Sequence, residues 1–499
     1  MRFSRTIPLS LLVVLLFASA AWPQAVVLEK DARTITDTLG GGGAAYSIRS
    51  AILRQTRRVN IATPASFSST GANRRYPVLI TFDGEFSFAR TVAAAKYLAE
   101  AGQIPEALVV AIENVSEDPR DRVFDLTPPG LSVSGSGTNQ GGDRLLDFIE
   151  KELLPALATQ FRAGAPTALI GHSSGGVLVT YAAFARPGAF PFVVAIDTPT
   201  NLQQGWLAQR FVESARKPPA KFLRYSSLEA RFGFSDKHWS ELLSLAPAGW
   251  KLHREKLAHE THNSMAFLAT YLGLREVFAD YSMIAAPDSP TSASLEHYSK
   301  FNAASGFSLV PPRPLLSRVI EDLLIEGNSL RAQQALDLLI SGYGDTPRAA
   351  DVRARIAEAA KLPPLGVTVE DLLNAPKPSP AQMAQFLGEW KGTMQVGDSE
   401  PEPVRVRFEA KNGEVQGAWS NWPAPDFELV MPLRYIKLVE GGLHFGYMNG
   451  MRPRGMLVYE AQFREGKLEG EMHMRGVRFT PPGGRERPKF RFRLQRSKP

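Results

Sequence analysis

Residues 168–179, ALIGHSSGGVLV, carry the side chain best placed to act as a nucleophile. Residues 171–175, Gly-His-Ser-Ser-Gly, fit the pattern G-x-S-x-G, in which a serine stands on a tight turn between a strand and a helix. A serine in that position can attack a carbonyl carbon, and the amide of the next residue faces the developing oxyanion. The spacing therefore makes Ser173 a candidate nucleophile and Ser174 a candidate oxyanion donor.

A nucleophilic serine needs a base, which in this order of elements follows the last strand. His262 lies in a polar loop after the predicted strand 251–257 and before the predicted helix 267–274, so it is the candidate base. His259 is the alternative. The stretch HETH at residues 259–262 is one residue too short for the zinc motif H-E-x-x-H, so neither a metal nor another cofactor is expected.

For the carboxylate that orients the base, the sequence offers three candidates. Glu229 directly follows the predicted strand 222–226, and Asp236 lies one loop further on. Position favours Glu229, while Asp236 is the alternative because aspartate is more common in this role. Asp197, at the end of the predicted strand 192–196, comes third and is more typical of a carboxylate that caps a loop.

A second oxyanion donor is expected in the loop after the predicted strand 76–83. Gly84 permits close approach of the backbone there, and the amide of Glu85 is the expected donor.

The elements that must position these residues alternate between strand and helix. Short apolar runs bounded by polar loops predict strands at 46–53, 56–63, 76–83, 107–113, 167–170, 192–196, 222–226 and 251–257. Helical periodicity falls between them at 89–101, 143–161 and 176–186. This alternation predicts an α/β-hydrolase fold, with a mostly parallel sheet and helices on both faces.

The remainder of the chain changes character twice. Residues 26–295 form the predicted α/β domain, followed by a helical, repeat-like segment at 296–362 and a Pro-rich linker at 363–380. Residues 381–499 contain short alternating runs separated by turn signals, which predict an antiparallel β barrel.

Composition excludes several classes of function. The formal charge of +7 on 499 residues is modest and scattered, so no nucleic-acid partner is expected. The chain has no cysteine, which excludes disulfides and thiol catalysis. Arg2, Arg5 and the short apolar run 9–17 predict a signal peptide within residues 1–25. We therefore expect export to a bacterial periplasm or medium without a stable membrane anchor, and the oligomeric state stays open.

An ordered set of motifs resembles the "putative esterase" family of α/β hydrolases, which includes enterobactin-type siderophore esterases, esterase D-like enzymes and relatives of mycolyl transferases. The motifs are YPVLITFDG at 76–84, the Arg122–Thr127 stretch, GHSSGG at 171–176, RPGAF at 186–190 and HNS at 262–264. The resemblance implies that Ser173 is the nucleophile, His262 the base and residues 83–85 the oxyanion loop. The C-terminal segment, from FLGEWKGT at 386–393, resembles lipocalin-like domains.

The expected function is thus that of an exported serine esterase acting on carboxylic esters, of siderophore type or with small acyl groups. The small-molecule ester is its expected partner. The alternative is a hydrolase-fold protein that is non-catalytic or transfers acyl groups, with a ligand bound to its C-terminal β domain.

Overall fold

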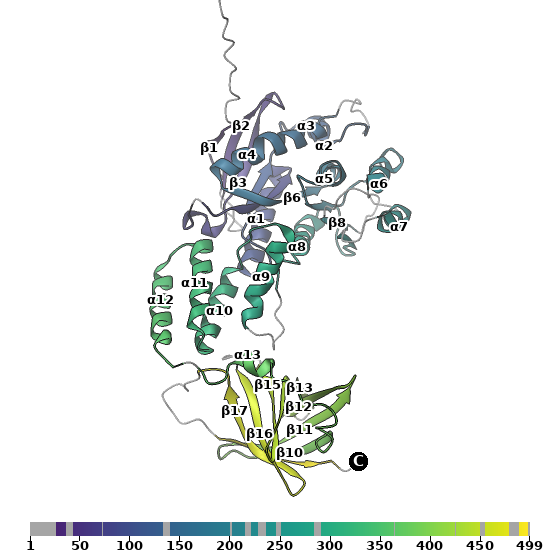
Figure 1. Cartoon of the computed structure of the whole chain (residues 1–499). Helices are drawn as coiled ribbons and strands as arrows, with labels where there is room; N and C mark the ends of the chain where they lie inside the picture. Colours follow the sequence, from purple (N-terminus) through teal and green to yellow (C-terminus); the bar gives the residue numbers. More distant parts are fainter. Residues whose placement is uncertain are drawn as a thin grey trace, which may run out of the picture.

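The computed structural model of the chain is shown in Figure 1. It describes residues 26–35, 43–71, 73–132, 140–199, 202–214, 221–227, 236–245, 251–283, 291–363, 365–424, 426–449, 455–478 and 489–497. The predicted signal peptide lies outside the described residues.

A mostly parallel sheet forms the N-terminal part. Its strands are β1 (Leu28–Ile35), β2 (Gly43–Ser50), β3 (Gln55–Ala62), β4 (Tyr76–Phe82), β5 (Leu108–Ile112), β6 (Ala163–His172), β7 (Phe192–Ile196), β8 (Lys221–Ser226) and β9 (Leu252–Lys256). They lie in the order β1-β2-β3-β5-β4-β6-β7-β8-β9. The strands from β4 to β9 are parallel, whereas β1, β2 and β3 pair antiparallel at one edge.

Helices cover both faces of this sheet. They are α1 (Gly84–Glu100), α2 (Pro119–Leu126), α3 (Gly142–Phe148), η2 (Ile149–Leu153), α4 (Leu154–Gln160), α5 (Ser174–Ala185), α6 (Leu202–Ser214), α7 (Asp236–Leu245) and α8 (Met265–Val277). Alternate residues of β4 enter different cores: Val78 and Ile80 pack with α3, α4 and α5, and Leu79 packs with α1 and α8. A strand buried on both faces explains the continuous apolar runs in the sequence.

The predicted fold class is confirmed by this sheet and its helices. Neither β1 nor α2 was predicted from the sequence. Residues 119–126 read PRDRVFDL, and their charges obscure the apolar periodicity from which a helix is predicted. The helix starts there because the Asp118 side chain accepts a hydrogen bond from the Arg120 amide and Pro119 occupies the first turn.

Within the sheet domain, the short helix η1 (Ala65–Ser68) precedes β4. The helices that follow the sheet domain are α9 (Thr291–Ser305), α10 (Arg313–Ile325), α11 (Ser329–Tyr343), α12 (Pro347–Ala360) and α13 (Val369–Leu373). Three contacts join them to the sheet domain and to each other: Ser69 Oγ to the Tyr343 carbonyl at 2.8 Å, the Tyr281 hydroxyl to the Val310 carbonyl at 2.6 Å and the Tyr343 hydroxyl to the Pro311 carbonyl at 3.0 Å. The helices thus pack directly on the sheet domain.

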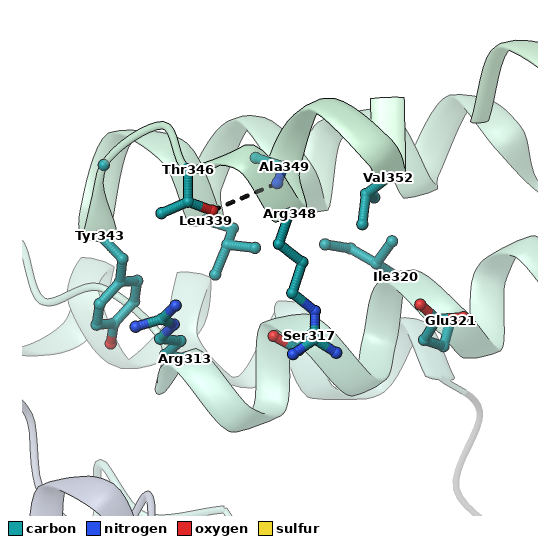
Figure 2. A pocket seen from close by; sticks show the side chains of 11 residues that line it. Arg313, Ser317, Ile320, Glu321, Leu339, Tyr343, Thr346, Arg348, Ala349 and Val352 are labelled. Carbon is teal, nitrogen blue, oxygen red and sulfur yellow. Dashed lines mark hydrogen bonds between the residues drawn. The ribbon is translucent and has the colours of Figure 1, made fainter. Parts of the chain in front are cut away.

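A small cavity lies between α10, α11 and α12 (Figure 2). Arg348 extends from α12 toward Ser317 on α10, and Thr346 accepts a hydrogen bond from the Ala349 amide at the start of α12. The volume of about 50 Å³ is far below that of ordinary small-molecule pockets. This cavity therefore has no direct part in the chemistry considered below.

The C-terminal part is a curled antiparallel sheet. Its strands are β10 (Gly388–Val396), β11 (Glu402–Lys411), β12 (Glu414–Ala424), β13 (Phe427–Pro432), β14 (Tyr435–Val439), β15 (Gly442–Met448), β16 (Met456–Arg464), β17 (Lys467–Arg475) and β18 (Phe490–Arg496). The order is β13-β12-β11-β10-β18-β17-β16-β15-β14. The edge strands are consecutive in the chain, and between them Leu433 donates to Gly417 on β12 and Arg434 to Gly446 on β15. Residues 433 and 434 therefore link the two edge strands of the sheet, which curls into a half-barrel (Figure 1).

Aromatic rings fill the inside of the curled sheet. The ring of Trp419 stacks on that of Tyr459 at 4.0 Å, and Phe445 stacks on Tyr459 at 5.2 Å. All three side chains are buried. This packing describes a hydrophobic core, and the predicted ligand-binding role of this domain stays a prediction.

Among the described residues, no helix has both the length and the apolar character that a membrane crossing needs.

Candidate active site

Ser173 stands alone between the end of β6 and the start of α5. Its φ of 57° and ψ of −120° lie in a region that residues other than glycine rarely adopt, at a cost of about 1–3 kcal/mol. The Ser173 amide donates to the carbonyl of Ile196 at 2.9 Å, and its own carbonyl accepts from Val177 at 3.2 Å. The turn thus holds a half-buried serine in a strained backbone conformation at the carboxyl edge of the sheet.

Two glycines make this turn possible. A Cβ on Gly171 would lie 2.2 Å from the carbonyl oxygen of Gly175, and a Cβ on Gly176 would lie 2.2 Å from Oγ1 of Thr198. At Gly175 the nearest atom to such a Cβ would be 3.5 Å away, which is ordinary contact. The crowding therefore explains Gly171 of the G-x-S-x-G pattern and Gly176 just beyond it, rather than Gly175.

His262 contacts a carboxylate from the neighbouring strand. Its Nδ1 lies 2.7 Å from Oδ2 of Asp197, the residue that directly follows β7. Asp197 is fully buried, and it also accepts hydrogen bonds from the amide of Ser227 at 2.9 Å and from the Ser227 hydroxyl at 2.8 Å. Each Asp197 oxygen therefore has at least one donor.

These donors keep Asp197 ionised. Burial alone would raise the pKa of Asp197, but the hydrogen bonds from Ser227 and His262 lower it below its usual value. An ionised carboxylate can only accept, so Nδ1 of His262 carries a proton. Nε2 is then the basic nitrogen of the neutral ring, which is the tautomer that a general base needs.

Three chain segments bring Ser173, His262 and Asp197 together. The Ser173 amide binds the carbonyl of the residue before Asp197. The ring of His172, which precedes Ser173, lies 4.5 Å from the ring of His262, centroid to centroid. The nucleophile turn, the end of β7 and the loop before α8 therefore meet at one edge of the sheet.

The acid in this arrangement differs from the one that the sequence favoured. Glu229 lies outside the described residues, and Asp236 begins α7 but its side chain also lies outside them. We correct the assignment to Asp197, because its carboxylate is the one in contact with His262. β7 is the immediate neighbour of β6, and Ser227 after β8 supplies two hydrogen bonds that stabilise a buried carboxylate there. His259, the alternative base, is exposed.

The predicted oxyanion donors all lie at helix N-termini. Gly84 and Glu85 are the first residues of α1, and Ser174 is the first residue of α5. Amides in the first turn have no acceptor within their own helix and attract negative charge. A Cβ on Gly84 would lie 3.0 Å from the Glu113 amide nitrogen, so glycine is needed here for packing against the end of β5. The roles of these residues stay predictions.

Arg122 on α2 connects the two helix N-termini. Its Nε lies 2.5 Å from Oδ1 of Asp83 and its Nη2 lies 2.8 Å from Oδ2, while Nη1 donates to Oγ of Ser174 at 3.1 Å. Asn114 also donates to Asp83, at 3.1 Å. The hydrogen bond to Asp83 is the main cause of the raised pKa of Arg122. A permanent positive charge therefore stands beside the nucleophile turn.

A buried ion pair fixes α2 in this position. Nη2 of Arg57 on β3 lies 2.6 Å from Oδ2 of Asp125, and Nη1 of Arg57 donates to the Glu113 carbonyl at 3.2 Å. From the sequence, Arg122 was named only within the Arg122–Thr127 motif and was not a candidate site residue. A local signal for its role was absent, because its partners Asp83 and Ser174 are far from it in the sequence.

The site has the elements of acyl chemistry. It combines a strained serine, a histidine paired with a buried carboxylate, and helix N-termini with an arginine where negative charge would develop. Within the described ranges, no group of three or more metal-ligating side chains is placed to hold a metal ion.

The chain is similar to several known proteins. Residues 50–255 match the family described as "Putative esterase". A relative from Aspergillus fumigatus, the siderophore triacetylfusarinine C esterase, is 37% identical over 127 residues, which are 24% of this chain and 42% of that protein. The chain therefore matches less than half the length of this relative.

Solved structures are also similar to this chain. The IroE-like serine hydrolase from Shewanella oneidensis has a TM-score of 0.49 and 25% identity, covering 60% of this chain and 98% of its own. The siderophore hydrolase EstA from Aspergillus nidulans has a TM-score of 0.43 and 19% identity, covering 49% of this chain and 97% of its own. Over residues 50–255, the α/β domain of this chain is thus similar to the putative esterase family.

Proposed function

We propose that the α/β domain is a serine esterase that hydrolyses carboxylic esters through Ser173, His262 and Asp197. The observation that carries the proposal is the 2.7 Å contact between His262 Nδ1 and the buried Asp197, beside a serine held in a strained turn. The similarity of residues 50–255 to the putative esterase family supports the same reaction.

The proposed reaction begins with acylation of Ser173. Nε2 of His262 takes the hydroxyl proton as Oγ of Ser173 bonds to the ester carbonyl carbon, and the carbonyl π electrons move to its oxygen. The amides of Ser174 and of Glu85 or Gly84 donate to this oxyanion, and the charge of Arg122 stabilises it further. When the oxyanion collapses, the carbon–oxygen bond to the alcohol breaks and His262 returns its proton to the leaving alkoxide.

Water completes the cycle. His262 takes a proton from a water molecule as the water oxygen attacks the acyl carbon, and a second tetrahedral oxyanion forms in the same place. Its collapse breaks the bond to Oγ of Ser173, which recovers its proton from His262. The products are an acid and an alcohol.

We further propose that the substrate is an ester of siderophore type or one with a small acyl group. The name of the Aspergillus fumigatus relative supports the first class. The direct test uses the purified full chain with a fluorophosphonate probe and a panel containing p-nitrophenyl acetate, a hydroxamate siderophore ester and a catecholate siderophore ester. We expect a covalent label on Ser173 and turnover of at least one ester. Folded protein that takes no label at Ser173 and cleaves none of the panel would contradict the proposal.

Arg122 provides a prediction about the oxyanion. Arg122→Lys keeps a positive charge but loses the planar guanidinium group, whose three nitrogens each make one of the contacts with Asp83 and Ser174. The single nitrogen of an ammonium group cannot reproduce this geometry. We expect kcat to fall about 100-fold with a much smaller change in KM. The matched control is Arg120→Lys on the same helix, whose side chain is 88% exposed and pairs with Asp118. The assignment fails if both variants retain the same kcat.

We also propose that the protein is exported. Arg2 and Arg5, the apolar run 9–17 and the small residues Ala18-Ser19-Ala20 support this proposal. In a bacterial host that expresses the full chain, we expect the protein in the periplasm or medium, with its N-terminus at residue 21 or 26. Retention in the cytoplasm with residues 1–20 still attached would contradict export.

A further inference from the structure

A second histidine lies beside the proposed base and has no role in the reaction described above. His172 is the last residue of β6 and directly precedes Ser173. Its half-buried ring lies 4.5 Å from the ring of His262, centroid to centroid, with 35° between their planes. The two rings are therefore in close contact, with their planes tilted relative to each other.

The hydrogen bond between these residues has a defined direction. Nε2 of His172 lies 2.7 Å from the backbone carbonyl oxygen of His262. A carbonyl oxygen only accepts, so Nε2 of His172 carries a proton and donates it. The residue before the nucleophile thus binds the main chain of the proposed base directly.

Burial is the main reason that the ring of His172 stays neutral, because it lowers the pKa of His172 to about 4. The charges of His262 and of Arg90 on α1 lower the pKa further, whereas the hydrogen bond to the His262 backbone and the charge of Asp197 raise it. At neutral pH the ring therefore holds a single proton, on Nε2, and leaves Nδ1 without one. A neutral ring also adds no repulsion when its neighbour gains a proton.

The loop that carries His262 needs such a contact. It connects β9 to α8 and has local hydrogen bonds, such as the Thr261 amide to Oγ of Ser264 at 2.9 Å. These local bonds shape the loop but do not relate it to the nucleophile turn. Asp197 orients the ring of His262 through Nδ1, whereas His172 fixes the position of its backbone relative to Ser173.

We infer that His172 is a positioning residue that holds His262 in the place from which its ring can reach Ser173. It does so by a hydrogen bond to the His262 carbonyl and by contact of the two rings. This inference rests on the proposed esterase function. It assigns His172 no contact with the substrate and no proton transfer.

The test compares two substitutions that separate the hydrogen bond from the ring. His172→Gln can keep an N–H donor at nearly the same reach but has no ring, and His172→Phe keeps a ring but has no donor. We expect kcat for an ester that the wild-type protein cleaves to fall about tenfold or more in His172→Phe, because a buried carbonyl loses its donor. His172→Gln should recover most of this loss, and KM should change less than threefold in both variants.

Two further measurements distinguish an effect of the substitutions on folding from an effect on the position of His262. Thermal unfolding at pH 7 and pH 5 should show that both variants fold, and that the wild-type protein loses more stability than either variant on acidification. The sign follows from linkage: the lowered pKa means that the unfolded chain binds a proton at pH 5 that folded His172 does not. Fluorophosphonate labelling at Ser173 should slow in parallel with kcat.

The outcomes are distinguishable from failure of the esterase proposal itself. If the wild-type protein neither hydrolyses esters nor takes the label, the proposed function fails. If the wild-type protein is active and folded His172→Phe keeps kcat within twofold, the positioning role is wrong. It is also wrong if folded His172→Gln is as slow as His172→Phe, since the donor then makes no difference.

Discussion

Ser173→Ala is expected to lower kcat for ester hydrolysis by about 10⁴-fold or more, equivalent to about 5 kcal/mol of transition-state stabilisation. The substitution removes the atom that forms the acyl-enzyme, while the groups proposed for the oxyanion remain in place. Alanine is only one oxygen smaller than serine and takes the same half-buried position on the turn. Binding of substrate or product, measured by calorimetry, should therefore change little.

A neighbouring serine provides the matched control for this substitution. Ser174→Ala removes a hydroxyl that accepts a hydrogen bond from Arg122 at 3.1 Å but keeps the amide proposed as an oxyanion donor. We expect a loss of about tenfold or less, with the fluorophosphonate label still on Ser173. If Ser174→Ala abolishes the label and Ser173→Ala does not, Ser174 is the nucleophile and the assignment is wrong.

The nucleophile turn could be predicted because its signal is local. The glycines that the turn requires lie within three residues of Ser173, and the apolar run before them identifies a buried strand. The fold class followed from the same kind of local pattern, repeated along the chain. Such a pattern depends only on residues that are neighbours in the sequence. It can therefore be recognised without knowing the order of the strands in the sheet.

The acid and the arginine depend on neighbours in space. Asp197 could be recognised only with the knowledge that β7 adjoins β6 and that Ser227, at the end of β8, donates twice to the Asp197 carboxylate. Arg122 is 39 residues from Asp83 and 52 from Ser174. The sequence places both residues in loops or short helices, where a solvated side chain is the usual outcome. The position of Asp197 directly after an apolar strand was its local signal, but this position alone does not distinguish a catalytic acid from a carboxylate that caps a loop.

The carboxylate partner of His262 is tested by Asp197→Asn, for which we expect kcat at neutral pH to fall about 10³–10⁴-fold. Asn keeps the size of the side chain but replaces one carboxylate oxygen by an NH₂ group. If that NH₂ group faces His262, Nδ1 must accept its hydrogen bond, so the ring proton moves to Nε2 and the base can no longer take the proton of Ser173. If the amide oxygen faces His262 instead, the NH₂ group faces the Ser227 amide, which is also a donor. In a fully buried site, the first orientation therefore gives His262 the wrong tautomer, and the second places two hydrogen-bond donors against each other.

The two carboxylates that the sequence favoured supply the controls for this experiment. Glu229→Gln and Asp236→Asn make the same chemical change after β8, and each should keep kcat within about threefold of the wild-type value, as substitutions away from the reacting groups do. Unfolding midpoints at neutral pH identify any variant whose loss reflects misfolding. A large loss in Glu229→Gln or Asp236→Asn, together with near-normal turnover in Asp197→Asn, would move the acid to the segment after β8. The reverse pattern would mean that the acid is selected by Ser227 and by the order of β6, β7 and β8. Together they place a buried carboxylate, which accepts two hydrogen bonds from Ser227, against Nδ1 of His262.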